Sequence, residues 1–230
     1  MTLTTAEAPT TGPETPTTTD PGLLTVDPGG RMDGATAGYV KHLGDLVGVY
    51  RDRAGYEEAV ARRGADEVVY RVEEHRPADG EGALVIGTST LLPGRCGEEF
   101  ALTRGHLHAR ADRAELYHCL SGHGVMLLET VDGRSTTVEL SAGQACHVPG
   151  HWVHRSVNVG AEPFVTLFCY AADAGQDYGI IERAGGMATL VVSDGATGWT
   201  TRPNPDHTGY RVPATPATPA TPAGGRSTSC

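Results

Sequence analysis

Apolar and polar residues alternate in short runs along the middle of the chain, at the spacing of β-strands. Many of these runs are rich in β-branched residues, and glycine, proline or aspartate separates most of them. We expect strands over residues 67–73, 83–92, 100–103, 116–120, 124–130, 136–140, 145–148, 154–159, 164–170 and 187–193. Short strands at this spacing, with no long helical pattern between them, indicate an all-β sandwich or barrel.

Single residues locate one helix and one tight turn. Asp52 is a candidate N-cap, good helix formers follow it, and Gly64 is a candidate C-terminal stop. The sequence therefore predicts a short N-terminal helix over residues 52–64. Asp132-Gly133 stands between two apolar-alternating runs, which predicts a β-hairpin.

The two ends of the chain differ in composition from its middle. Residues 1–22 are mostly Thr, Pro, Ala and Glu, and the C-terminal end contains Ala-Thr-Pro three times in succession. Such segments bury too little apolar surface to offset the entropy of ordering them. We therefore expect a disordered arm over 1–36, one folded domain over 37–202 and a disordered tail over 203–230.

The charge balance narrows the class of partner. The 230 residues include 28 acidic and 18 basic side chains, for a formal net charge of −10, and Lys41 is the only lysine. This composition argues against nucleic-acid binding. We find no apolar run long enough for a membrane span and no secretory signal. Five cysteines without a C-x-x-C pair indicate free thiols, so we expect a cytoplasmic protein.

Three histidines and one glutamate form a candidate metal site. His106 and His108 are two residues apart, so on a strand they point to the same side. Glu115 begins the next predicted strand, and His154 comes from a distant one. Imidazole and carboxylate ligands together suit Fe²⁺, Mn²⁺, Ni²⁺ or Zn²⁺, so we expect one divalent ion here.

The spacing of these residues carries a family resemblance. The chain reads Gly105-His-x-His-x6-Glu-x6-Gly122 and then Gly143-x5-Pro149-Gly150-x3-His154-x3-Asn158. Residues 83–170 thus resemble the two-motif signature of the cupin superfamily. The six residues between the histidine pair and the glutamate exceed the usual three or four. That longer gap resembles one subfamily, the cupin-type glucose-6-phosphate isomerases best known in archaea, and the resemblance extends over about residues 44–190.

This resemblance implies a single cupin (jelly-roll) β-barrel, a homodimer and the interconversion of glucose 6-phosphate and fructose 6-phosphate in glycolysis and gluconeogenesis. It implies His106, His108, Glu115 and His154 as ligands, with Fe²⁺ the first candidate. The sugar phosphate would contact seven residues that match family positions: Tyr70, Ser89, Thr103, Gly105, Tyr117, Tyr170 and Tyr178. Two positions depart from the family: Gln176 stands where a histidine is usual, and His151 where an aromatic residue is common.

More than one mechanism, and more than one function, is compatible with these residues. Aldose–ketose isomerisation moves hydrogen between C1 and C2, by an enediol with a general base or by a hydride shift. We assign Glu115 as ligand and proton shuttle, and Tyr117, which shares its strand face, to the catalytic set. Two alternatives stay open: a non-haem metal dioxygenase of the same fold, and a sugar-phosphate-binding cupin without catalysis.

Overall fold

The computed structural model describes residues 20–196 and 198–211, and most of its regular structure is β-strand. The largest sheet has six strands in the order β12-β9-β14-β5-β4-β3, each antiparallel to its neighbours. Its strands are β3 (Ala37–His42), β4 (Val68–His75), β5 (Leu84–Leu91), β9 (Glu115–Ser121), β12 (Ala145–Val148) and β14 (Phe164–Ala171). Buried and more exposed positions alternate along β9, so Glu115, Tyr117 and Cys119 face the interior.

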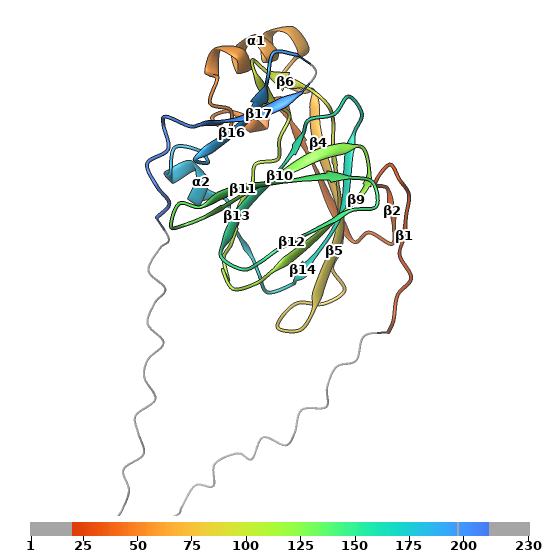
Figure 1. Ribbon diagram of the computed structural model, residues 1–230. Coiled ribbons are helices and arrows are strands. Elements are labelled where there is room, and N and C mark those ends of the chain that lie inside the picture. The colour runs from red at the N-terminus through yellow and green to blue at the C-terminus, as the bar shows by residue number, and fades with distance from the viewer. Residues whose placement is uncertain (1–19, 197, 212–230) are drawn as a thin grey trace, which may run out of the picture.

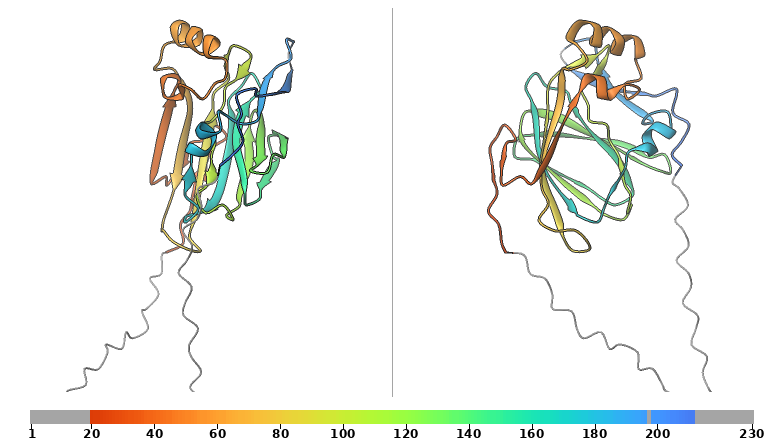
Figure 2. Two further views of the ribbon diagram at one scale, coloured as in Figure 1. Left: turned by 90° about the vertical axis from the view of Figure 1, so that its left-hand side faces the viewer. Right: turned by 180° about the vertical axis from the view of Figure 1, so that it is seen from behind.

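A second sheet of three strands faces the first across an apolar core, as Figures 1 and 2 show. It has the order β11-β10-β13, from β10 (His123–Thr130), β11 (Ser135–Ser141) and β13 (Trp152–Asn158). The hairpin expected at Asp132-Gly133 is confirmed, because Gly133 has φ 98° and β10 pairs with β11 around it. Fully buried core side chains include Phe164, Met126 and Leu140, and each contributes about 1.5–3 kcal/mol by leaving water.

The all-β class with one short N-terminal helix is confirmed. The sheets are hydrogen-bonded separately, so within the described residues they form an open, cupin-like enclosure and not a closed barrel. One link across the enclosure is a pair of hydrogen bonds between His106 and His154, which joins the segment before β8 (Leu107–His108) to β13. β15 (Gln176–Asp177) pairs with β8 on the same side of the enclosure.

The predicted helix is α1 (Arg53–Arg63), which lies at the top of the molecule in Figure 1. Its start and end are those expected: the Asp52 side chain accepts a hydrogen bond from the backbone of Gly55, and Gly64 has φ 89°. The helix packs beside β6 (Arg95–Cys96). This close approach requires glycine at position 97, because a Cβ there would lie 1.9 Å from the Asp52 carboxylate. A short 3-10 helix (Leu43–Leu46) precedes it.

The remaining elements form small additions at the edges of the enclosure. β1 (Thr25–Val26) pairs with β2 (Met32–Asp33). A four-stranded sheet has the order β17-β16-β7-β6, where β7 is Glu99–Phe100, β16 is Thr189–Ser193 and β17 is Trp199–Pro203. The short helix α2 (Gly179–Arg183) follows β15. In the described part of the chain, neither helix has the length and apolarity that a membrane crossing needs.

The disordered arm expected over residues 1–36 is wrong for residues 25–36, where β1 and β2 form and hydrogen bonds join the chain to the large sheet. The Met32 side chain is buried, and its N–H donates to the Glu73 carboxylate at 2.6 Å. The Thr88 hydroxyl donates to the carbonyl of Gly30 at 2.5 Å. Residues 1–19, which the same expectation covers, lie outside the described residues.

The tail expected over 203–230 is likewise wrong for residues 203–211. The Asn204 side chain is buried and donates hydrogen bonds to the carbonyls of Gly185 and Met187 at 2.9 and 2.8 Å. The Tyr210 hydroxyl donates to the buried carboxylate of Glu129. These polar anchors hold a segment whose apolar content is low, and residues 212–230 lie outside the described part.

Candidate metal centre and substrate cavity

The four residues predicted as metal ligands meet inside the enclosure. Glu115 is the first residue of β9, His154 lies in β13, His108 in β8, and His106 just before it. One ligand atom from each lies within 4.8 Å of the others. His106 and His154 are 48 residues apart in the sequence. They are brought together by two backbone hydrogen bonds, in which the N–H of each donates to the carbonyl of the other at 3.0 and 2.9 Å.

The imidazoles converge on one carboxylate oxygen. Glu115 Oε2 lies 2.9 Å from His154 Nε2, 3.2 Å from His108 Nε2 and 3.9 Å from His106 Nε2. His108, Glu115 and His154 are buried, whereas His106 is partly exposed to the cavity. Several possible metal-ligand atoms this close together in a buried place favour a bound cation.

Backbone carbonyls orient two of the rings for ligation. His108 Nδ1 lies 2.8 Å from the carbonyl oxygen of Arg113, and His154 Nδ1 lies 3.0 Å from that of Trp152. A carbonyl can only accept, so each Nδ1 carries the proton and each Nε2 presents its lone pair to the cluster. The buried Nε2 atoms of His106 and His108 make no hydrogen bond within the described residues. This donor set fits a divalent cation.

The electrostatics of the cluster differ from member to member. Burial lowers the pKa of His108, but the neighbouring Glu115 carboxylate outweighs it, so that pKa lies above its usual value. Burial lowers the pKa of His106 well below its usual value, and the neighbouring His154 lowers it further. Burial alone would raise the pKa of Glu115, but the close approach of His108 and His154 outweighs it and holds that pKa below its usual value. A neutral His106 and an ionised Glu115 both offer lone pairs to a cation.

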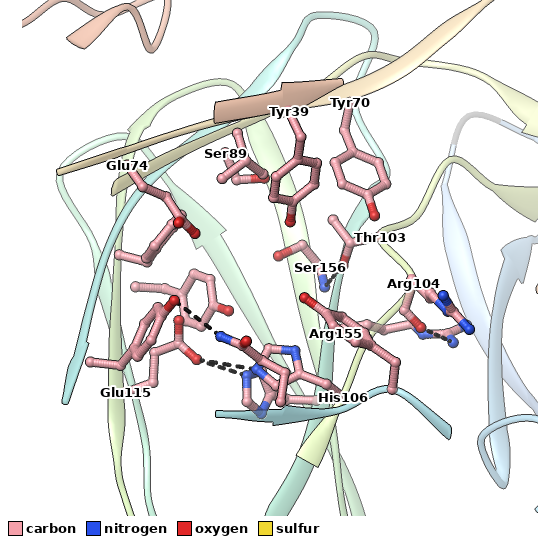
Figure 3. Close-up of a pocket in the computed structure, with 18 residues that line it drawn as sticks. Tyr39, Tyr70, Glu74, Ser89, Thr103, Arg104, His106, Glu115, Arg155 and Ser156 are labelled. Carbon is pink, nitrogen blue, oxygen red and sulfur yellow. Dashed lines mark hydrogen bonds and ion pairs between the residues drawn. The ribbon is translucent and has the colours of Figure 1, made fainter. Parts of the chain in front are cut away.

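A cavity opens beside this cluster, drawn in Figure 3. His106, Glu115 and His154 contribute to its wall. So do all seven residues expected to contact the sugar phosphate: Tyr70, Ser89, Thr103, Gly105, Tyr117, Tyr170 and Tyr178. They come from β4, β5, β9, β14, the segment before β8 and the start of α2.

One side of the cavity presents hydroxyl and backbone N–H groups. The Thr103 hydroxyl accepts a hydrogen bond from the backbone of Ser156 at 3.0 Å, which leaves its own proton free. Gly105 has φ 74°, and a Cβ there would lie 2.9 Å from the carbonyl oxygen of His154. Its glycine therefore lets the chain lie against β13, with the N–H not bonded to any backbone carbonyl in the described residues.

Aromatic residues also line the cavity. Tyr117 packs edge-on against His154, with ring centroids 5.8 Å apart, and Tyr170 stacks on Phe168. Burial raises the pKa of Tyr170 to about 12 and also raises the pKa of Tyr117 well above its usual value, so both hydroxyls stay protonated near neutral pH. Gln176 also lines the cavity, and its side-chain amide donates to the Tyr170 hydroxyl at 3.0 Å.

Sequence reasoning missed four polar residues of the cavity wall: Tyr39, Glu74, Arg155 and Ser156. Glu74 follows Tyr70 by four residues on β4, so strand alternation could have placed it on the same face. Arg155 is buried and donates to the carbonyl of Arg104 at 2.9 Å, for which the sequence offered no signal. His151, which departs from the family pattern, is exposed and is not among the residues that line the cavity.

Comparison with known proteins identifies relatives of this chain. A family model described as glucose-6-phosphate isomerase (GPI) matches residues 40–208. The glucose-6-phosphate isomerase of Sinorhizobium medicae (strain WSM419) is 47% identical over 170 residues, covering 74% of this chain and 79% of that protein. The enzyme of the same name from Thermococcus gammatolerans is 43% identical over 156 residues, covering 68% and 80%. That of Pyrococcus furiosus is 41% identical, covering 68% and 82%.

Solved structures resemble the chain more distantly. An oxalate oxidase structure, for example, matches with a TM-score of 0.40 at 17% identity, over 47% of this chain and 54% of that one. Similarity at this level does not bear on the reaction.

Proposed function

The chain belongs to the glucose-6-phosphate isomerase family, and from this membership we propose that it interconverts glucose 6-phosphate and fructose 6-phosphate, a step of glycolysis and gluconeogenesis. The main support for the proposal is that three imidazoles and one carboxylate converge beside a cavity rich in hydroxyl groups. An aldose–ketose isomerase must hold a phosphorylated sugar and move hydrogen between C1 and C2. The cavity offers groups for both tasks.

We propose His106, His108, Glu115 and His154 as the ligands of one divalent ion, with Fe²⁺ the first candidate and Mn²⁺, Ni²⁺ or Zn²⁺ the others. When bound, the ion supplies positive charge that polarises the sugar oxygens at C1 and C2. The orphaned Nε2 atoms of His106 and His108 support this assignment.

Glu115 is placed for proton transfer as well as ligation. Its close contacts with the three imidazoles all fall on Oε2. Oε1 is therefore the oxygen available to take a proton from one sugar carbon and return it to the next. Tyr117, two residues along the same strand face, stays protonated and can donate to a developing negative oxygen of the sugar.

The remaining wall residues are proposed to bind and orient the substrate. Hydroxyls of Tyr70, Ser89 and Thr103, with the N–H of Gly105, suit the phosphate group, since hydroxyl and amide protons are good donors to phosphate oxygens. Tyr170 and Tyr178 would contact the sugar. Tyr178 also stands 5.4 Å from the Arg104 guanidinium, which lies over its ring.

A coupled assay tests the proposal directly. The protein is stripped with a chelator and reloaded in turn with Fe²⁺, Mn²⁺, Ni²⁺ or Zn²⁺, and NADPH formation by glucose-6-phosphate dehydrogenase is followed with fructose 6-phosphate as substrate. Metal-dependent turnover is expected. Tight sugar-phosphate binding without turnover for any metal would favour a non-catalytic binding cupin, and oxygen uptake without isomerisation would favour a dioxygenase.

We further propose that the protein is a cytoplasmic homodimer. Support for the dimer comes from the family resemblance, and support for the compartment from cysteines 96, 119, 146 and 169, which are free thiols in the described chain. Light scattering after size-exclusion chromatography is expected to give twice the chain mass. A monomer mass at micromolar concentration would contradict the dimer.

A further inference from the structure

Glu74 is one of the polar residues of the cavity wall that the reaction just proposed leaves without a role. On β4, the residues Tyr70, Val72 and Glu74 alternate with Arg71 and Glu73, and all three of the first set line the cavity. Figure 3 shows the Glu74 carboxylate directed into the cavity. The strand therefore points this carboxylate at the substrate, not at solvent.

Its carboxylate is not held in an ion pair. Glu74 makes no ion pair within 4.0 Å in the described residues. Its neighbour Glu73, on the other face of β4, instead accepts a hydrogen bond from the N–H of Met32 and so anchors the N-terminal segment. The polar group beside Glu74 is the hydroxyl of Tyr170. A carboxylate has about four lone-pair sites, so acceptor sites remain for a ligand beside the Tyr170 hydroxyl.

Tyr170 is held so that it supports this arrangement. Gln176 donates its amide proton to the Tyr170 hydroxyl oxygen at 3.0 Å. That contact occupies an acceptor site of the hydroxyl and leaves its own proton to be donated elsewhere. Glu74 is the nearby acceptor, so Gln176, Tyr170 and Glu74 form a short polar row along the wall.

The charges of the cavity wall are divided between its two sides. In Figure 3, Glu74 and Glu115 lie on one side and Arg104 and Arg155 on the other. A sugar phosphate has one anionic end and a chain of hydroxyl donors. Its charges match those of the cavity wall when the phosphate lies toward the arginines and the hydroxyl chain toward the glutamates.

We propose that Glu74 binds the hydroxyl groups of the sugar chain and thereby sets the orientation and sugar preference of the enzyme. A carboxylate accepts two hydrogen bonds at once, and neighbouring hydroxyls of a sugar present two donors at matching spacing. The inference rests on the proposed isomerase function. It assigns to this chain a sugar-recognition residue separate from the metal ligands and from the phosphate-binding hydroxyls.

The test compares Glu74→Gln and Glu74→Ala with the control Glu58→Gln, which changes an exposed glutamate on α1. Glutamine keeps the shape of the side chain but replaces one acceptor oxygen by a donor. Hydrogen bonds to a charged group correspond to a change of about 10- to 100-fold. We expect kcat/KM for fructose 6-phosphate to fall by that factor in both Glu74 variants and to stay unchanged in Glu58→Gln.

Two competitive inhibitors separate sugar recognition from general damage. Glucitol 6-phosphate carries the whole hydroxyl chain, and inorganic phosphate carries none of it. The inhibition constant of glucitol 6-phosphate is expected to rise about 10- to 100-fold in the Glu74 variants, while that of phosphate and the metal content stay at wild-type values. An unchanged constant for glucitol 6-phosphate, or equal weakening of both inhibitors, would overturn the proposal.

Failure of the parent function can be distinguished from failure of this inference. If the wild type shows no isomerisation with any metal, the proposed function fails, and calorimetric titration with glucitol 6-phosphate replaces kinetics. Weaker binding in both Glu74 variants than in wild type still supports sugar recognition by Glu74, and equal binding overturns it.

Discussion

Replacing Gly105 by alanine tests how the fold positions the metal centre. Gly105 precedes His106 and has φ 74°, and its missing side chain lets the chain lie directly on β13. A Cβ there would meet the His154 carbonyl oxygen at 2.9 Å, the Ile181 side chain at 2.9 Å and the Arg155 Cβ at 3.0 Å. The carbonyl of His154 accepts the hydrogen bond from His106 that joins two ligand segments.

The expected magnitude has two parts. A left-handed φ costs a non-glycine residue about 1–2 kcal/mol. Displacing packed backbone adds about 1–3 kcal/mol, as overpacking does in a core. We therefore expect Gly105→Ala to lower the free energy of unfolding by about 2–5 kcal/mol, the sum of these two parts, and to shift His106 and His154 enough to weaken metal retention.

Gly48→Ala is the matched control. Gly48 has φ 78°, close to that of Gly105, but nothing lies within 4 Å of the position that a Cβ would take. This substitution carries only the backbone cost, about 1–2 kcal/mol. Urea unfolding and metal analysis of both variants separate the two parts. Equal destabilisation by the two substitutions, with full metal content in Gly105→Ala, would refute the steric argument.

Three further predictions concern the metal centre. His154→Ala or His106→Ala is expected to abolish metal retention, because either leaves an open ligand position. The control His118→Ala, which changes a residue on the other face of β9 from Glu115, is expected to keep the metal. Full metal occupancy of the two ligand variants by metal analysis would contradict the ligand set. Glu115→Gln is expected to lose turnover far more than substrate binding. In D₂O, the wild type is expected to incorporate deuterium at C1 or C2 of the sugar. An active wild type that incorporates no deuterium would leave Glu115 as a ligand only. Removing the ion with a chelator is expected to lower the midpoint temperature of thermal unfolding, and adding the ion back is expected to restore it. The reason is that a ligand that binds only the folded state stabilises that state. A midpoint temperature that does not change with metal would count against a site formed only on folding.

Much of the strand pattern and the metal cluster could be predicted from the sequence. Strand alternation depends only on which residues can be buried, so β9 and the hairpin after Thr130 could be located. The spacing of His106, His108 and Glu115, with His154 further on, is a local pattern of rare residue types. Their meeting within 4.8 Å agrees with the predicted convergence.

Contacts between residues far apart in the sequence were decided only by the tertiary structure. Met32 and Tyr210 anchor segments of low apolar content through Glu73 and Glu129, which are 41 and 81 residues away in sequence. Composition predicted disorder there because it counts apolar residues and cannot see a distant hydrogen-bond partner. The sheet order likewise decided that β4 contributes to the wall of the cavity that His106, Glu115 and His154 also line. Alternation puts Tyr70 and Glu74 on one face of a strand, but only the packing of β4 makes that face the wall of a substrate cavity.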